Sequence, residues 1–232
     1  SGGKDSGGML LFAKELYDRW GMQYQCVFAD TGNEHPVTLE YVASLPSKTG
    51  CPPIQVVRAD FSGRIAKKRA NIEKSKTYTD EMKKRVLACL HPTGVPFLDL
   101  CLWKGRFPSP RARFCTVELK IATVREFVQP MLDAGGVVES WQGIRAEEST
   151  ERAKMVKRVQ EEEGLFSVRP LLNWKLEKVL AIHKRHGLKL NPLYMKGMRR
   201  VGCMPCMMCG KDEMYQIARR FPEHIDRLRE WE

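Results

Sequence analysis

Residues 1–6, Ser-Gly-Gly-Lys-Asp-Ser, constrain the fold of this chain more than any other stretch. Two consecutive glycines allow a tight turn that exposes successive backbone N–H groups, and such a row of amides forms a concave anion site. Apolar residues recur at helical spacing from Met9 to Trp20, so we expect a helix to begin directly after the turn. The helix N-terminus and the ammonium group of Lys4 both favour an anion. Residues 1–6 are therefore a predicted phosphate-binding loop, with a simple helix cap as the alternative.

Short apolar runs that end in acidic residues recur after this helix. Residues 24–29 and 54–59 each precede an aspartate and a helical pattern, and further strand patterns cover 137–141 and 166–172. Polar residues at the carboxyl ends of parallel strands are where open α/β sheets bind ligands. The alternation predicts an α/β fold with a doubly wound, mainly parallel five-stranded sheet.

Other segments carry local predictions. Two basic helices are expected within residues 64–90, and a further helix begins with Thr116 as its N-cap. The charged stretch 151–163 favours a mobile or helical surface excursion. Asn173 is expected to cap the next helix, and two short helices account for residues 211–231.

The chain of 232 residues is long enough to bury one sizeable core with a small appended unit. We predict a nucleotide-binding α/β domain over residues 1–172. It includes an insertion at 91–113 that is rich in proline, glycine and aromatic residues. Residues 173–232 form a helical, cysteine-containing region packed on that domain.

Basic side chains outnumber acidic ones by 39 to 28, a net charge of +11. The excess is local, because residues 58–85 carry ten basic and four acidic side chains. This surplus favours a polyanionic partner such as nucleotide phosphates or nucleic acid, with a solvated basic face as the alternative. No apolar run approaches the roughly 20 residues that a membrane span requires, so no membrane association is expected.

The eight cysteines are not spaced like a disulfide framework. Cys203, Cys206 and Cys209 lie within seven residues, which is typical of metal or cluster binding in a reducing cytoplasm. A structural zinc site and an iron–sulfur cluster both fit this spacing.

Five motifs occur in a fixed order along the chain. They are the loop 1–6, Asp30-Thr31-Gly32, Arg113-Phe114-Cys115-Thr116, Gly143-Ile144-Arg145 and Cys203-Met204-Pro205-Cys206. Together they resemble the phosphoadenosine phosphosulfate (PAPS) reductase family, which belongs to the PP-loop ATP pyrophosphatases of the adenine nucleotide α-hydrolase superfamily. That family places a buried strand before the phosphate loop, so we expect residues upstream of Ser1.

The resemblance implies a site for ATP and Mg²⁺. The residues that it places at the nucleotide are Ser1, Gly2, Gly3, Asp5, Ser6, Asp30, Thr31, Gly143 and Arg145. Three residues are candidate catalytic groups. Lys4 can neutralise charge on departing pyrophosphate, Asp5 can hold Mg²⁺ or orient the loop, and Arg145 can clamp phosphate oxygens. An ion pair of Arg145 with Glu147 or Glu148 is the alternative.

The resemblance also implies that Cys115, Cys203, Cys206 and Cys209 bind a [4Fe–4S] cluster, with zinc as the alternative. In several sulfur-transferring relatives only three cysteines are ligands, which leaves one iron free to hold sulfide. In that case Cys209 is the expected non-ligand.

Departures from the family pattern separate the candidate activities. Sulfonucleotide reductases with a cluster carry adjacent cysteines where this chain has Cys115 alone, and their catalytic C-terminal cysteine motif is not found in residues 1–232. The chain more closely resembles the branch that works with cysteine desulfurases in DNA phosphorothioation. We therefore expect adenylylation of an acceptor, a DNA phosphate, followed by sulfur transfer with a cysteine desulfurase as sulfur donor.

Three other functions stay open at this point. They are reduction of PAPS or adenosine 5'-phosphosulfate, thiolation of tRNA, and nucleotide binding without turnover. The sequence leaves the oligomeric state open, with a homodimer as one candidate.

Overall fold

The computed structural model describes every residue from Ser1 to Glu232. The chain forms two compact units, each built from three separate stretches. The first unit contains Ser1–Phe28, His35–Val56 and Arg125–Gly202, and the second contains Ala29–Glu34, Val57–Val124 and Cys203–Glu232. This grouping differs from the contiguous division into 1–172 and 173–232. It differs because the helix that follows residue 173 packs against the first helix of the chain.

The first unit is organised around the helix that follows the phosphate loop. Its helices are α1 (Lys4–Trp20), α2 (Pro36–Ala43), α3 (Leu45–Thr49), α9 (Thr150–Ala153) and α10 (Leu176–Arg185), with the 3-10 turns η2 (Ala146–Glu148) and η3 (Pro192–Lys196). Leu11 of α1 and Ile182 of α10 share a core with Tyr41. A Cβ on Gly8 would lie 3.1 Å from Val179 Cγ1, so this glycine allows α1 and α10 to approach closely.

The five strands form two small sheets. Strands β1 (Cys26–Ala29) and β2 (Ile54–Val57) pair with each other, and β3 (Val138–Trp141), β4 (Arg158–Glu162) and β5 (Leu165–Val168) form the order β3-β5-β4. Strand β3 is parallel to β5, whereas β4 is antiparallel to it. The α/β class is confirmed, but a single five-stranded, mainly parallel sheet is not formed. The reason is that β3 pairs with β5 and not with β1 or β2.

The prediction that the charged stretch 151–163 is a mobile or helical surface excursion is wrong for most of its length. Only its start is helical, and β4 then forms a hairpin with β5 through a turn at Gly164, whose φ is +75°. Arg158 lies over the ring of Phe166 at 3.6 Å from its centroid. Arg158 is thus held on an exposed strand by the aromatic ring of the partner strand and by an ion pair with Glu139 at 3.0 Å.

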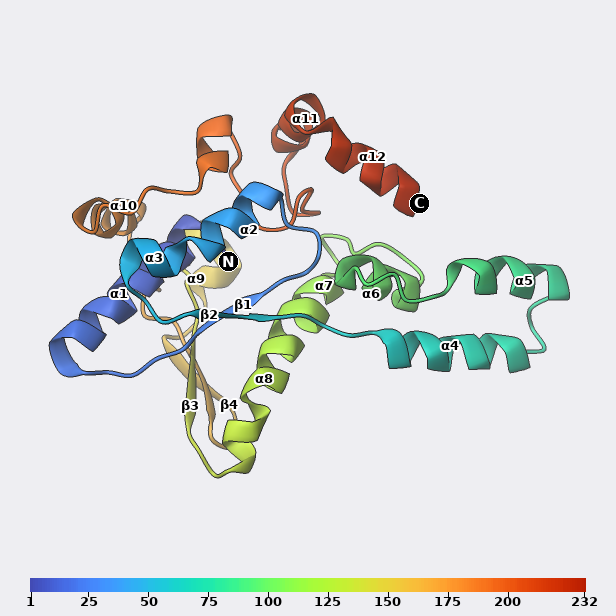
Figure 1. The fold of residues 1–232 in the computed structure, drawn as a ribbon, viewed down its shortest axis with the longest axis horizontal. Helices are drawn as coiled ribbons and strands as arrows, with labels where there is room; N and C mark the ends of the chain where they lie inside the picture. The colour runs from blue at the N-terminus through green and yellow to red at the C-terminus, as the bar shows by residue number, and fades with distance from the viewer. The chain divides into compact units, whose positions relative to one another are not determined.

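The second unit is mostly helical. Its helices include α4 (Ser62–Lys74), α5 (Asp80–Cys89), α6 (Pro96–Lys104), α11 (Lys211–Arg220) and α12 (Pro222–Trp231). Helices α4 and α5 lie side by side as a hairpin (Figure 1), and Ile65, Leu100 and Leu119 lie at the centre of the core. The predicted pair of basic helices and the two final helices are confirmed. No helix in either unit combines the length and apolar character that crossing a bilayer requires.

The helix expected to start at Thr116 begins earlier. It runs through α7 (Phe114–Thr116), the π-helical turn η1 (Val117–Ile121) and α8 (Ala122–Asp133). The N–H of Thr116 donates to Arg113 O at 3.0 Å, so Thr116 lies inside the first turn and its role as N-cap is wrong.

The cap predicted at Asn173 is also wrong. Helix α10 begins at Leu176 with Lys175 as its N-cap. Asn173 instead lies within a turn in which Trp174 N–H donates to Leu171 O at 2.8 Å.

Candidate functional site

Buried polar side chains of the first unit hold the phosphate loop, residues 1–6. Asn191 Nδ2 lies 3.4 Å from Gly2 O and 3.1 Å from Thr38 Oγ1, and Thr38 donates to Val201 O at 2.7 Å. Asn191 and Thr38 are both inaccessible to solvent. A Cβ on Gly2 would lie 2.9 Å from Thr38 Cγ2, so the loop backbone has no room for a side chain there.

Helix α1 begins without a side-chain cap, since its N-cap residue is Gly3. The first N–H groups of a helix have no acceptor within the helix. Lys4 N donates to Tyr194 Oη at 3.0 Å, whereas no acceptor in the protein binds the N–H groups of Asp5 and Ser6. These two donors are therefore available to an anion.

The segment that follows β3 touches the phosphate loop through Gly143 and Arg145. A Cβ on Gly143 would lie 2.9 Å from Asp5 O and 3.0 Å from Ser6 N, so only glycine permits this approach. The Arg145 guanidinium donates from Nε to Asp5 Oδ1 and from Nη1 to Glu147 Oε1. The structure thus brings Arg145 to the loop and also forms its predicted alternative pair with Glu147.

Two cations, Lys4 and Arg145, flank the Asp5 carboxylate in the phosphate loop. Lys4 Nζ lies 3.6 Å from Asp5 Oδ2, on the oxygen that Arg145 does not use. Burial opposes the charge of Arg145, but hydrogen bonds and ion pairs with Asp5 and Glu147 outweigh it and raise the pKa of Arg145. Arg145 is therefore a fixed, buried cation beside two free backbone donors.

A second site lies in the second unit, where the loop at Cys203 pairs with residues after β1. Glu34 and Cys203 form an antiparallel bridge, and Met204 N–H donates to Asn33 O at 2.7 Å. Cys203 Sγ lies 3.3 Å from Thr31 Oγ1 and 3.6 Å from Glu34 Oε1. Burial raises the pKa of Cys203 to about 11.

Cys115 reaches the same loop from the start of α7. Its Sγ lies 3.7 Å from Met207 Sδ, and Cys209 N–H donates to Cys206 O at 2.8 Å. Burial raises the pKa of Cys115, and the nearby Cys206 thiol raises it further. The four predicted ligands therefore lie in one unit, with Cys115, Cys203 and Cys206 close enough to interact electrostatically. We call these four residues the thiol cluster.

Sequence reasoning missed Lys120, which lies in the π-helical turn η1. Interactions with Cys203, Glu34, Cys206 and Cys115 raise the pKa of Lys120, with Cys203 contributing most, although burial opposes the shift. Turns of this type occur frequently at functional sites. A helical lysine is usually solvated, so nothing in the local sequence distinguished this one.

Glu34 is the second residue that the sequence analysis missed. It is 7% exposed and accepts hydrogen bonds from Thr31 N at 3.0 Å and from Thr31 Oγ1 at 2.8 Å. Burial raises the pKa of Glu34, while Thr31 and Lys120 act in the opposite direction. Its place beside Cys203 depends on the β-bridge, which joins residues far apart in the sequence.

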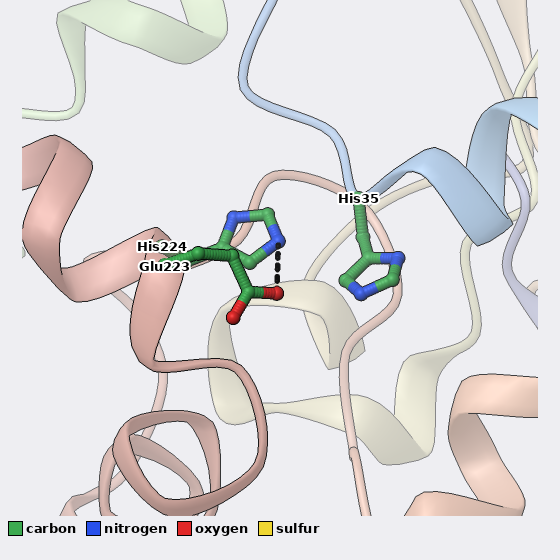
Figure 2. Close-up of side chains that lie close together, drawn as sticks. All are labelled: His35, Glu223 and His224. Carbon is green, nitrogen blue, oxygen red and sulfur yellow. Dashed lines mark ion pairs between the residues drawn. The ribbon is translucent and has the colours of Figure 1, made fainter.

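Helix α12 supports the Cys203 loop. Arg227 Nη2 donates to Asn33 Oδ1 at 2.6 Å and to Met204 O at 2.9 Å. The same nitrogen lies 3.0 Å from Nδ1 of the buried His224. His224 Nε2 is 4.0 Å from Glu223 Oε1, the pair marked in Figure 2. The loop that carries Cys203 is therefore fixed on both sides by hydrogen bonds.

The thiol cluster supplies the donor type that a thiolate-bound metal requires. A [4Fe–4S] cluster and zinc are both held by cysteine thiolates. Burial raises the pKa of Cys203 and Cys115 and so disfavours their thiolates, whereas Lys120 supplies a positive charge that favours them.

The predicted nucleotide residues divide between the units. The loop 1–6, Gly143 and Arg145 lie together in the first unit, whereas Asp30 and Thr31 belong to the second. Asp30 Oδ2 lies 3.2 Å from Arg58 Nε, within the second unit. The roles of Asp30 and Thr31 at a nucleotide stay predictions.

Comparison with known proteins places this arrangement in a family. The chain is 45% identical over 248 residues to an uncharacterized 37.8 kDa protein of Escherichia phage 186, covering 100% of this chain and 72% of that protein. It is 35% identical to adenosine 5'-phosphosulfate reductase of Burkholderia cepacia over 81 residues, 34% of this chain and 32% of that enzyme.

A solved structure agrees at the level of the fold. PAPS reductase from Candida auris, crystallised as a phosphate complex, matches 87% of this chain and 77% of its own with a TM-score of 0.51 at 15% identity. The model of the phosphoadenosine phosphosulfate reductase domain matches residues 1–209. The chain belongs to the phosphoadenosine phosphosulfate reductase family.

Proposed function

We propose that this protein is a PP-loop ATP pyrophosphatase that adenylylates a nucleic-acid phosphate, with DNA as the preferred acceptor, and prepares it for sulfur transfer. The observation that carries the proposal is the uncapped start of α1. Its Asp5 and Ser6 N–H groups have no acceptor in the protein, and the buried Arg145 cation lies beside them. Free amides and a guanidinium together suit the oxygens of a polyphosphate.

Each loop residue then has a role in cleavage between the α and β phosphates. The ammonium group of Lys4 leaves Asp5, pairs with phosphate oxygens and neutralises the charge that develops as pyrophosphate leaves. Asp5 Oδ2, released from Lys4, becomes available to Mg²⁺, which prefers carboxylate and phosphate oxygens. Arg145 keeps Asp5 in position through its Nε bond.

The thiol cluster supports the sulfur half of the proposal. A bound [4Fe–4S] cluster would supply iron sites that can hold sulfide. Cys115, Cys203 and Cys206 would hold the metal, and Lys120 would stabilise their thiolates. None of the eight cysteines forms a disulfide, which suits the cytoplasm, where a cysteine desulfurase would deliver the sulfur.

Pyrophosphate release tests the first step. Purified protein is incubated with ATP, Mg²⁺ and single-stranded DNA, and pyrophosphate is measured by a coupled assay. Lys4→Ala should lower the rate by about a hundredfold or more. Lys14→Ala, on the same helix and paired only with Asp18 at 2.7 Å, should leave it unchanged. No pyrophosphate with DNA or tRNA would contradict the proposal, and transfer of ³⁵S to one of them identifies the acceptor.

Sulfonucleotide reduction is the second candidate, because the chain is similar to proteins described as adenosine 5'-phosphosulfate reductase. Release of sulfite from adenosine 5'-phosphosulfate or PAPS, with thioredoxin as reductant, would favour it. The solitary Cys115 argues against it, since a reductase needs a further thiol to attack sulfur.

A further inference from the structure

The second unit contains a cavity of about 730 Å³ that the proposed chemistry does not use. It lies among α4, α5, α6 and α12, and this volume is within the range of about 300–1,000 Å³ typical of ligand sites. Apolar and aromatic side chains form much of its wall, including Leu98, Phe107 and Trp231. The cavity therefore suits a flat apolar group such as a nucleobase.

Cations also line this cavity. Arg85 and Arg106 form no ion pair, although Arg106 lies over the ring of Phe114 at 5.6 Å from its centroid. Lys68 Nζ donates to Leu102 O at 2.9 Å. Glu232 is the acidic member of the lining. Two guanidinium groups without acidic partners, beside an apolar wall, match a ligand that is aromatic at one end and anionic at the other.

The hairpin of α4 and α5 extends this positive charge. Lys67 and Lys74 lie on one exposed stripe of α4, since they are separated by about two helical turns. Lys84 is exposed on α5. None of these three lysines forms an ion pair, although the structure contains many surface ion pairs elsewhere. Three exposed, unpaired lysines on the hairpin that borders the cavity fit a chain of phosphates better than one small anion.

We propose that the hairpin and this cavity bind single-stranded nucleic acid, with one unstacked base in the cavity and the flanking phosphates along α4 and α5. This inference rests on the proposed function, because it names the surface that would hold the acceptor. Duplex is disfavoured because its bases are stacked and paired and cannot enter a cavity without being extruded. A free nucleotide would use the cavity and leave the hairpin lysines without a role.

Binding is tested directly, without ATP, by fluorescence anisotropy of a labelled single-stranded DNA. The triple variant Lys67→Glu, Lys74→Glu, Lys84→Glu should weaken binding by roughly tenfold or more and reduce the salt dependence by about one unit of slope per lysine. The matched control is Lys157→Glu, Lys184→Glu, Lys189→Glu, three exposed lysines of the first unit with the same change in charge. Equal effects of the two triple variants, or duplex binding as tight as single-strand binding, would overturn the proposal.

Insertion of a base into the cavity can be measured by fluorescence. An oligonucleotide with one 2-aminopurine should change its fluorescence on binding, because the base leaves its stacked neighbours. Met82→Glu, which puts a carboxylate on an exposed residue of the cavity lining, should abolish that fluorescence change and keep the salt dependence of DNA binding.

An unchanged 2-aminopurine signal with wild-type protein would refute the proposal that a base enters the cavity. If wild-type protein releases pyrophosphate but binds no single-stranded DNA in the anisotropy assay, this inference alone is refuted. If it binds DNA as proposed but releases no pyrophosphate, the proposed function alone is refuted.

Discussion

In the first unit the groups offered to a ligand are backbone amides, whereas in the second unit they are thiols. The phosphate loop is fixed by steric contacts on its glycines and by neutral, buried partners such as Asn191 and Thr38. The thiol cluster is fixed by a β-bridge and carries buried ionisable groups, among them Glu34, Cys203 and Lys120. The phosphate loop should therefore be sensitive to side-chain volume, and the thiol cluster should be sensitive to pH.

Arg145→Ala should have the largest effect, because Arg145 is the one buried charge on which the phosphate loop depends. The change leaves Asp5 and Glu147 without their guanidinium partner, and we expect a loss of about 3 kcal/mol in the free energy of unfolding. Urea denaturation measures it. Arg152→Ala, at a more exposed ion pair with Glu148, should cost under about 1 kcal/mol. Similar losses in the two variants would contradict the buried role of Arg145.

The thiol cluster should lose stability in alkali when no metal is bound. Folding raises the pKa of Cys203 from 9.0 to about 11, so the folded state keeps a proton that the unfolded state releases. This stabilisation is complete below pH 9.0 and is lost as the pH rises towards 11, with a magnitude on the order of 3 kcal/mol.

Cys203→Ser isolates this contribution, since serine does not titrate in that range. The variant should show a shallower loss of stability with pH than the wild type, as measured by urea denaturation across the alkaline range. Cys89→Ser, at an exposed cysteine, is the control and should keep the full slope. Cys26 and Cys101, whose pKa values burial also raises to about 12, titrate equally in both variants. Identical slopes for the two variants would show that Cys203 is not coupled to folding.

Gly2→Ala, compared with Gly3→Ala, tests whether the phosphate loop is sensitive to side-chain volume. A Cβ on Gly2 would lie 2.9 Å from Thr38 Cγ2, whereas on Gly3 the nearest atom would be Tyr194 Oη at 3.5 Å. We expect a cost of about 1–3 kcal/mol for Gly2→Ala and little change for Gly3→Ala. Thermal unfolding of both variants checks the difference, and equal midpoints would mean that the loop is less tightly held than this contact implies.

Tyr194→Phe should have the smallest effect. The variant removes the hydroxyl that accepts from Lys4 N at 3.0 Å, one hydrogen bond worth about 1 kcal/mol. It also leaves a third N–H of α1 without a partner, so phosphate should bind at least as well as in the wild type. Weaker binding of inorganic phosphate, measured by calorimetry, would show that Tyr194 contributes to the ligand itself.

Local sequence patterns predicted the helices whose formation depends on residues close together in the sequence. The first helix and the two last helices follow from apolar spacing and from Pro222 at a helix start. The N-caps at Thr116 and Asn173 failed because backbone hydrogen bonds to Arg113 and Leu171 decided those turns.

Contacts between distant segments could not be predicted in this way. The motif Gly143-Ile144-Arg145 was identified through resemblance, but its reason, the contact of Gly143 with Asp5 O, appears only in the fold. Lys120 and Glu34 were missed because their chemistry arises from the pairing of Glu34 with Cys203, which no local periodicity encodes.

Because each unit is built from three separate stretches of the chain, the two units cannot be separated by simple truncation. Residues 29–34 belong to one unit although the stretches on either side of them belong to the other. Removal of Cys203–Glu232 would keep all three stretches of the first unit but would take one stretch from the second, so no single cut separates the two units. Folding of the first unit must await synthesis of Arg125–Gly202 and that of the second must await Cys203–Glu232, so both units depend on contacts between segments that are distant in the sequence.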